Sequence, residues 1–98
     1  MLEEEPVQFY FLITGVHDRQ RYYEWIKELG GVCLDMETQD EEVWKQKCTH
    51  LITNGRNPPR TQKLVAAQKC GAYIVIKTFV TDSITKGSFV DEDSYLVQ

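Results

Sequence analysis

Apolar residues along this chain fall into short continuous runs separated by stretches with helical spacing. The first run, "VQFYFLIT" from Val7 to Thr14, is rich in β-branched and aromatic residues and predicts a strand buried on both faces. Asp18 is then placed to cap a helix over residues 19–29, whose apolar positions recur at helical spacing and which stops before Gly30. The pattern therefore begins with a buried strand followed by an amphipathic helix.

The rest of the chain continues this alternation. Three more strands are predicted at "GVCLD" (31–35), "THLIT" (49–53) and "YIVI" (73–76). Thr61 is placed to cap a helix over "QKLVAAQKC", and "KTFVTDSITKG" predicts a last helix closed by Gly87. Between the second and third strands, the polar run "DMETQDEE" and the residues around Trp44 predict a solvated loop or a fragment of helix.

Strands that alternate with helices imply a parallel sheet with right-handed crossovers. We therefore predict a single small α/β domain over residues 1–98, with a four-stranded parallel sheet flanked by about three helices and a flexible lead at residues 1–6. The carboxyl ends of parallel strands share one edge of the sheet. The turn after Thr14 and the start of the helix after Thr61 are expected to meet at that edge.

The bulk composition limits the class of protein. With 98 residues, 42% of them hydrophobic, the chain can form one core and is too short for a large enzyme. No Ser-His-Asp or Cys-His arrangement is recognisable from the spacing, so we expect neither catalysis nor a cofactor. The net charge of -4 argues against binding of duplex DNA, which requires a cationic surface.

Cysteine usage and hydropathy bear on the cellular compartment. Cys33, Cys48 and Cys70 are odd in number and lack paired spacing, which suggests reduced thiols in an intracellular protein. No apolar run is as long as a membrane span, and the first residues, "MLEEEP", lack the basic and apolar regions of a signal peptide. These features favour a cytosolic or nuclear domain.

A metal site is considered at Cys48 and His50. Two potential ligands at this spacing, with no second pair, make an ordinary structural role the preferred interpretation. His50 also alternates with apolar residues along a predicted strand. We therefore expect a hydrogen-bonded structural histidine and no metal.

An anion site is the second candidate for chemistry. Thr14 offers a hydroxyl, Gly15 a backbone N–H that no side chain obstructs, and Lys63 an ammonium near the amino end of a helix, where free amides also favour anions. Thr61 caps that helix and fixes the direction of the lysine. Residue by residue, however, a strand end, a turn and a solvated lysine remain the simpler interpretation.

A resemblance changes this balance. The ordered pieces "LITGV", "ELGG", "CTHLIT", "RTQK" and "TFVTDSITKGSFVDEDSYL" together resemble the BRCT domain family of DNA-damage-response proteins over nearly the whole chain. In phosphopeptide-binding members, a Ser or Thr followed by Gly after the first strand and a Lys in an Arg-Thr-x-Lys motif form the phosphate pocket. The resemblance implies that Thr14, Gly15 and Lys63 bind phosphate, supported by Thr61 and Arg60.

The sequence departs from the family pattern at several places. Phe79 stands where the family usually has tryptophan in the last helix, and Ser83 takes the place of a small residue that is often Cys. The segments "DMETQDEEVWKQK" and "NGRNPP" are longer than is common and affect the edge of the pocket. Only one repeat is present, whereas phosphopeptide readers of this family often use two.

The resemblance implies a nuclear protein-interaction module that binds phosphoserine or phosphothreonine segments of partner proteins in DNA-damage or checkpoint signalling. It is also consistent with one repeat of a checkpoint scaffold that contains several such domains, packed against an adjacent repeat. The alternative is a scaffold domain that binds its partner without phosphate. Binding of DNA ends or poly(ADP-ribose), which some family members show, is a third and less favoured possibility, and the net charge of -4 makes duplex DNA the least favoured ligand. With Lys63 at the surface, Lys63→Met is expected to abolish phosphopeptide binding with little change in melting temperature.

Overall fold

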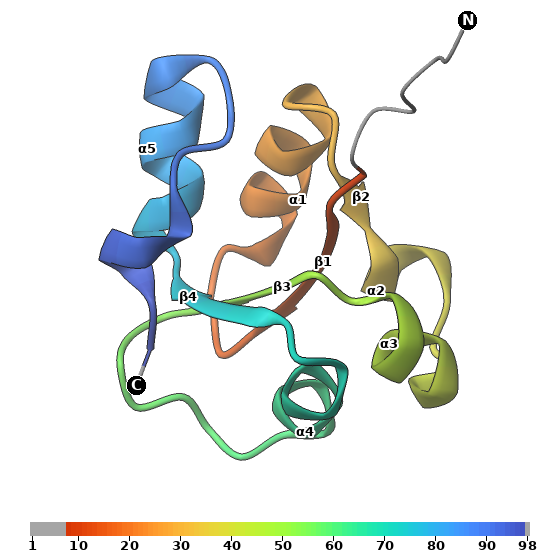
Figure 1. Ribbon diagram of the computed structural model, residues 1–98. Coiled ribbons are helices and arrows are strands. Elements are labelled where there is room, and N and C mark those ends of the chain that lie inside the picture. The colour runs from red at the N-terminus through yellow and green to blue at the C-terminus, as the bar shows by residue number, and fades with distance from the viewer. Residues whose placement is uncertain (1–7, 98) are drawn as a thin grey trace, which may run out of the picture.

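The computed structural model describes residues 8–97 and contains one four-stranded parallel sheet in the order β2-β1-β3-β4 (Figure 1). The strands are β1 (Tyr10–Thr14), β2 (Val32–Cys33), β3 (His50–Thr53) and β4 (Tyr73–Ile76). The helices are α1 (Arg19–Glu28), α2 (Leu34–Glu37), α3 (Glu41–Lys47), α4 (Gln62–Cys70), α5 (Thr78–Lys86) and the 3-10 helix η1 (Glu92–Tyr95). The lead expected at residues 1–6 lies outside the described residues. Within residues 8–97, no helix is long and apolar enough to span a membrane.

Helices cover both faces of the sheet, which confirms the expected α/β class. Helices α1 and α5 pack on one face, and α3 and α4 lie toward the other (Figure 1). Side chains of β1 alternate between two cores: Phe11 and Ile13 pack with α1 and α5, and Leu12 packs with α3 and α4. β1 is paired on both sides, as its continuous apolar sequence predicts, and its carboxyl end lies beside that of β3 at the pair Thr14 and Thr53.

The segment after β2 differs from the expected strand and loop. The strand predicted at 31–35 is limited to Val32–Cys33, and Leu34 and Asp35 instead begin α2, where both are buried. The polar run that follows is not a plain solvated loop, because it forms the rest of α2 and the start of α3. Trp44 on α3 is only 4% exposed and donates its indole N–H to Thr38 O at 3.0 Å. Burial of these side chains therefore orders a segment that its polar composition marks as loop. Of the two alternatives predicted for the residues around Trp44, the fragment of helix is correct.

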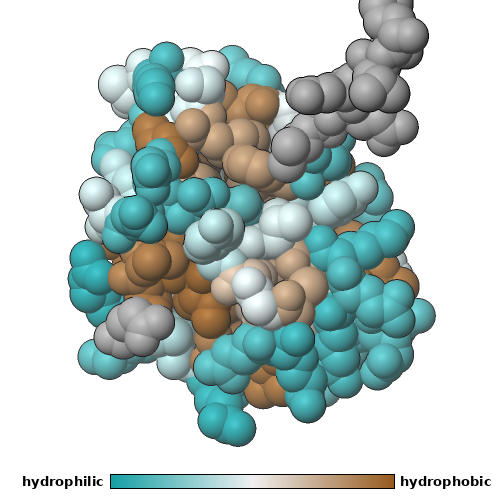
Figure 2. All heavy atoms as spheres, viewed as in Figure 1, coloured by the Kyte–Doolittle hydropathy of each residue, from teal (hydrophilic) through white to brown (hydrophobic). Residues whose placement is uncertain are grey.

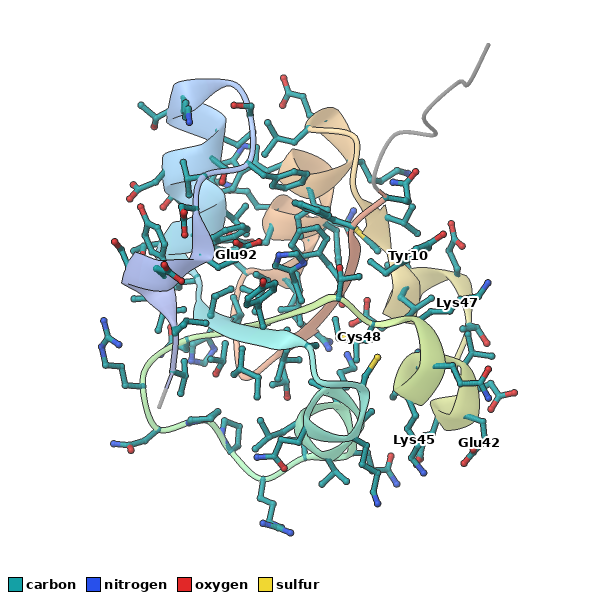
Figure 3. The ribbon with its side chains drawn as sticks, viewed as in Figure 1. Tyr10, Glu42, Lys45, Lys47, Cys48 and Glu92 are labelled. Carbon is teal, nitrogen blue, oxygen red and sulfur yellow. The ribbon has the colours of Figure 1, made fainter. Side chains whose placement is uncertain are left out.

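His50 is the structural histidine that the sequence predicts. Its side chain is 1% exposed; Nδ1 lies 2.8 Å from Thr49 Oγ1 and Nε2 lies 2.7 Å from Oε2 of Glu92, which reaches from η1 toward the sheet (Figure 3). Burial lowers the pKa of His50 below its ordinary value, although Glu92 partly offsets this. The lowered pKa favours the neutral ring, and both ring nitrogens have hydrogen-bond partners in the protein.

The C-terminal segment lies along the outer edge of β4. Leu96 forms an antiparallel bridge with Val75, and the Val97 N–H donates to Ile74 O at 2.8 Å. Arg56 also donates to Leu96 O at 2.8 Å, which ties the segment to the loop before α4. Hydrophobic surface lies over this edge in Figure 2. The segment thus satisfies backbone groups that an edge strand otherwise exposes.

The second glycine of the pair after α1 is required by packing. A Cβ added to Gly31 would lie 2.8 Å from Ile26 Cγ2 and 2.9 Å from Phe11 Cε1, and both neighbours are fully buried. We therefore expect Gly31→Ala to lower the free energy of unfolding by about 1–3 kcal/mol in urea denaturation, through overpacking. Gly55→Ala is the matched control, because no atom lies within 4 Å of its added Cβ. Equal losses in the two variants would contradict this explanation.

Candidate functional site

The residues predicted to bind phosphate line one cavity at the carboxyl edge of the sheet. The cavity has a volume of about 630 Å³, and its lining includes Thr14, Gly15, Thr61 and Lys63. β1 and β3 end side by side at this edge, and α4 begins there after the "NGRNPP" loop. The parallel topology therefore brings together two motifs that lie far apart in the sequence, as predicted.

Two threonine hydroxyls meet in the cavity wall. Thr14 Oγ1 lies 3.0 Å from Thr61 Oγ1, and Thr61 Oγ1 accepts a hydrogen bond from the Leu64 N–H at 3.2 Å as the cap of α4. The contact between the hydroxyls uses one of their two protons. The other proton remains available to a ligand oxygen in the cavity.

Gly15 provides a close approach between the turn and the loop before α4. Its φ is +70°, and an added Cβ would lie 3.1 Å from Pro59 Cδ. A residue other than glycine would therefore be strained at this position and would push against the proline ring. The long "NGRNPP" connection packs against the turn here, and Lys63 still reaches the cavity.

Lys63 is held inside the cavity wall, so the expectation that it is a surface residue is wrong. Its side chain is 18% exposed, and Nζ donates to Ile13 O at 3.0 Å and to Asp35 Oδ2 at 2.8 Å. Nζ also lies 5.9 Å from the centre of the Trp44 ring. Two of the three ammonium N–H groups thus have acceptors within the described residues, which leaves one for a ligand.

Asp35 is the main feature of the site that sequence reasoning missed. It is 4% exposed, and its Oδ2 accepts from Lys63, from the Tyr23 hydroxyl at 2.6 Å and from the Ile13 N–H at 3.2 Å. Burial, followed by the bond to Asp35, raises the pKa of Tyr23 far above its usual value, so the hydroxyl stays a donor. The one available signal was its position directly after the apolar "VCL".

Arg60, predicted as a supporting residue, lies outside this cavity. It is exposed and lines a neighbouring cavity of about 290 Å³, which shares Thr61 and Gln62 with the larger one. Arg19, at the start of α1, does line the larger cavity and was not anticipated. Arg60 is thus adjacent to the site and not part of its wall.

The arrangement provides the donors that a tetrahedral anion requires. They are a hydroxyl, an ammonium, the backbone at Gly15 and the amino end of α4, all at one cavity. Between residues 8 and 97, no group of three or more His, Cys, Asp and Glu side chains is placed to hold a metal ion. The donors at this cavity are of the kind that bind anions.

Comparisons with known proteins find relatives over nearly the whole chain. The family model of the Regulator of Ty1 transposition protein 107 BRCT domain matches residues 2–97. The BRCT domain-containing protein At4g02110 of Arabidopsis thaliana is 31% identical over 94 residues, which is 95% of this chain and 6% of that protein. This chain therefore spans a small part of that relative.

Solved structures share the fold at low sequence identity. The second XRCC1 BRCT domain has a TM-score of 0.67 and 16% identity, over 92% of this chain and 86% of that chain. Rad4 BRCT1,2 in complex with a Crb2 phosphopeptide has a TM-score of 0.64 and 16% identity, over 90% of this chain and 44% of that chain. The Rad4 chain is thus about twice as long as the matched region.

Proposed function

The chain belongs to the BRCT domain family, a family of protein-interaction modules, and from this premise we propose that its edge cavity binds a phosphorylated serine or threonine of a partner protein. The observation that carries the proposal is the convergence of Thr14, Gly15 and Lys63 on one cavity. The similarity to Rad4 BRCT domains solved with Crb2 and Mdb1 phosphopeptides supports it at the level of the fold.

The strength of such binding follows from the donors available. A phosphate carries about -1.5 to -2 charges at pH 7, and each charged hydrogen bond contributes roughly 1.5–3 kcal/mol. Three such bonds, less the cost of ordering a peptide, give a dissociation constant of about micromolar order or weaker. A single domain therefore binds modestly, and an adjacent repeat would increase the effective affinity.

The test is a titration with phosphothreonine peptides selected from a degenerate library, alongside their unphosphorylated counterparts. We expect binding of the phosphorylated form only. Thr14→Val should weaken that binding by about tenfold, because one hydrogen bond to the phosphate is lost, while the chain stays folded by circular dichroism. Thr85→Val, on the exposed side of α5, is the matched control and should leave the affinity unchanged. Equal affinity for both peptide forms would refute the proposal.

A scaffold function without phosphate is the second candidate, and one observation favours it. Lys63 already has a carboxylate partner, Asp35, at 2.8 Å in the free protein, so its charge is largely satisfied without a ligand. In that case the domain packs against another repeat or a protein partner, and phosphorylated and unphosphorylated partners bind equally. The same titration therefore distinguishes the two functions.

The cellular setting forms part of the proposal. The family resemblance supports a role in DNA-damage or checkpoint signalling in the nucleus, with a phosphorylated protein as partner. The net charge of -4 disfavours duplex DNA as the ligand. Localisation of the tagged full-length protein before and after DNA damage tests this setting.

A further inference from the structure

The buried carboxylate of Asp35 contacts Lys63, the lysine on which the proposed phosphate binding depends. Asp35 lies on α2, and its Oδ2 accepts from Tyr23 on α1, from Ile13 on β1 and from Lys63 on α4. Four elements thus meet at one oxygen. With a side chain 1% exposed, the carboxylate is fixed next to the ammonium and shielded from water.

The negative charge of Asp35 beside Lys63 makes the electrostatic potential of the cavity less positive. A phosphate that contacts Lys63 Nζ also lies close to Asp35, because Oδ2 is only 2.8 Å from that nitrogen. The lysine attracts the anion and the carboxylate repels it, and in a protein interior both interactions are stronger than in water. Both interactions scale with the charge of the phosphate, so the repulsion from Asp35 offsets part of the attraction from Lys63.

We propose that Asp35 is an affinity-determining residue that keeps phosphate binding by this domain weak and readily reversible. It acts through Lys63 and through its charge, without contacting the ligand. This inference rests on the proposed function, since it concerns the same cavity. The consequence is that a phosphorylated partner needs a second contact, such as one with an adjacent repeat, for stable binding.

The hydrogen-bond pattern allows a substitution that removes the charge of Asp35 and keeps Lys63 in place. All three donors bind Oδ2, whereas Oδ1 is buried with no partner among the described residues. In Asp35→Asn, the amide oxygen can take the place of Oδ2 and the NH2 group that of Oδ1. Lys63 then keeps its two acceptors, and the negative charge is lost.

The test compares the affinity of wild type, Asp35→Asn and Tyr23→Phe for one selected phosphothreonine peptide and its unphosphorylated form. Asp35→Asn should bind the phosphorylated peptide at least about tenfold more tightly, because repulsion of a dianion is removed, and should bind the unphosphorylated peptide as wild type does. Tyr23→Phe removes a bond to the same oxygen but keeps the charge, so it should produce no such increase. A purely structural role for Asp35 predicts the opposite sign, a loss of affinity.

Folding is controlled within the same experiment. All proteins are measured in buffer with trimethylamine N-oxide, which favours the folded state, and Asp35→Ser serves as a second variant without the charge. Unchanged or weaker phosphopeptide binding by the folded neutral variants would overturn the inference, as would equal tightening by Tyr23→Phe. If wild type does not distinguish the two peptide forms, the proposed function itself fails; if it does and the neutral variants bind no more tightly, only the role of Asp35 fails.

Discussion

Lys63→Met is expected to lower the free energy of unfolding by about 3–5 kcal/mol, because it leaves a buried carboxylate without its cation. Lys63 Nζ lies 2.8 Å from Asp35 Oδ2, and the Asp35 side chain is 1% exposed. Methionine fills much of the space of the lysine stem, so the loss arises from the uncompensated charge of Asp35 and not from a cavity. Urea denaturation followed by circular dichroism measures the loss.

A lysine on the same helix provides the matched control. Lys69 on α4 is exposed, and Lys69→Met should change stability by no more than about 0.5 kcal/mol. Adding Asp35→Asn to Lys63→Met should restore part of the lost stability, because the buried charge is then removed as well. Simple additivity of the two changes would show that the ion pair does not couple these residues.

This expected loss of stability replaces the expectation drawn from the sequence, which was that Lys63→Met changes the melting temperature little. For a domain of this size, each kcal/mol shifts the melting temperature by about 4–8 °C. Loss of peptide binding in Lys63→Met would therefore combine a lost ligand contact with partial unfolding. Thr14→Val is the more informative variant, because Thr14 bears no charge and its hydroxyl is hydrogen-bonded only to Thr61 among the described residues.

Most of the fold could be predicted from local patterns. Continuous apolar residues mark the strand that ends at Thr14. The Thr61 cap and Gly71 mark the two ends of the helix over Gln62–Cys70. The helices α2 and α3 could not be predicted with the same detail, because their polar composition resembles that of a loop. They are ordered by long-range burial, chiefly of Trp44.

The candidate site also has one part that the sequence predicts and one part that it does not. The convergence of Thr14 with Lys63 follows from parallel topology, since both lie at the carboxyl edge of the sheet. The burial of Asp35 does not follow from any local pattern, because its three donors come from β1, α1 and α4. The sequence therefore predicts which of these groups share one cavity, but not the buried carboxylate beside Lys63.

Phe79→Ala is expected to lower the free energy of unfolding by about 3–5 kcal/mol, the usual cost of removing a buried aromatic ring. Phe79 is fully buried on α5, where its ring centre lies 5.5 Å from that of His50 and 6.4 Å from that of Phe11. Phe79→Leu is the matched control: it keeps much of the volume and should cost clearly less. Similar losses for both variants would show that the ring does not support the core in this way.

The same variant should also change the pH dependence of stability. In the wild type, burial lowers the pKa of His50, so the unfolded chain binds a proton at this residue more readily than the folded chain does. Stability therefore falls as the pH is lowered through the ordinary histidine pKa of about 6.5. Without the Phe79 ring, His50 is less desolvated, its pKa moves back toward the ordinary value, and this loss becomes smaller. Urea denaturation at pH 7.5 and at pH 5.5 measures the loss of stability between the two pH values for the wild type and for Phe79→Ala. An equal loss in the two proteins would show that the Phe79 ring does not keep His50 neutral.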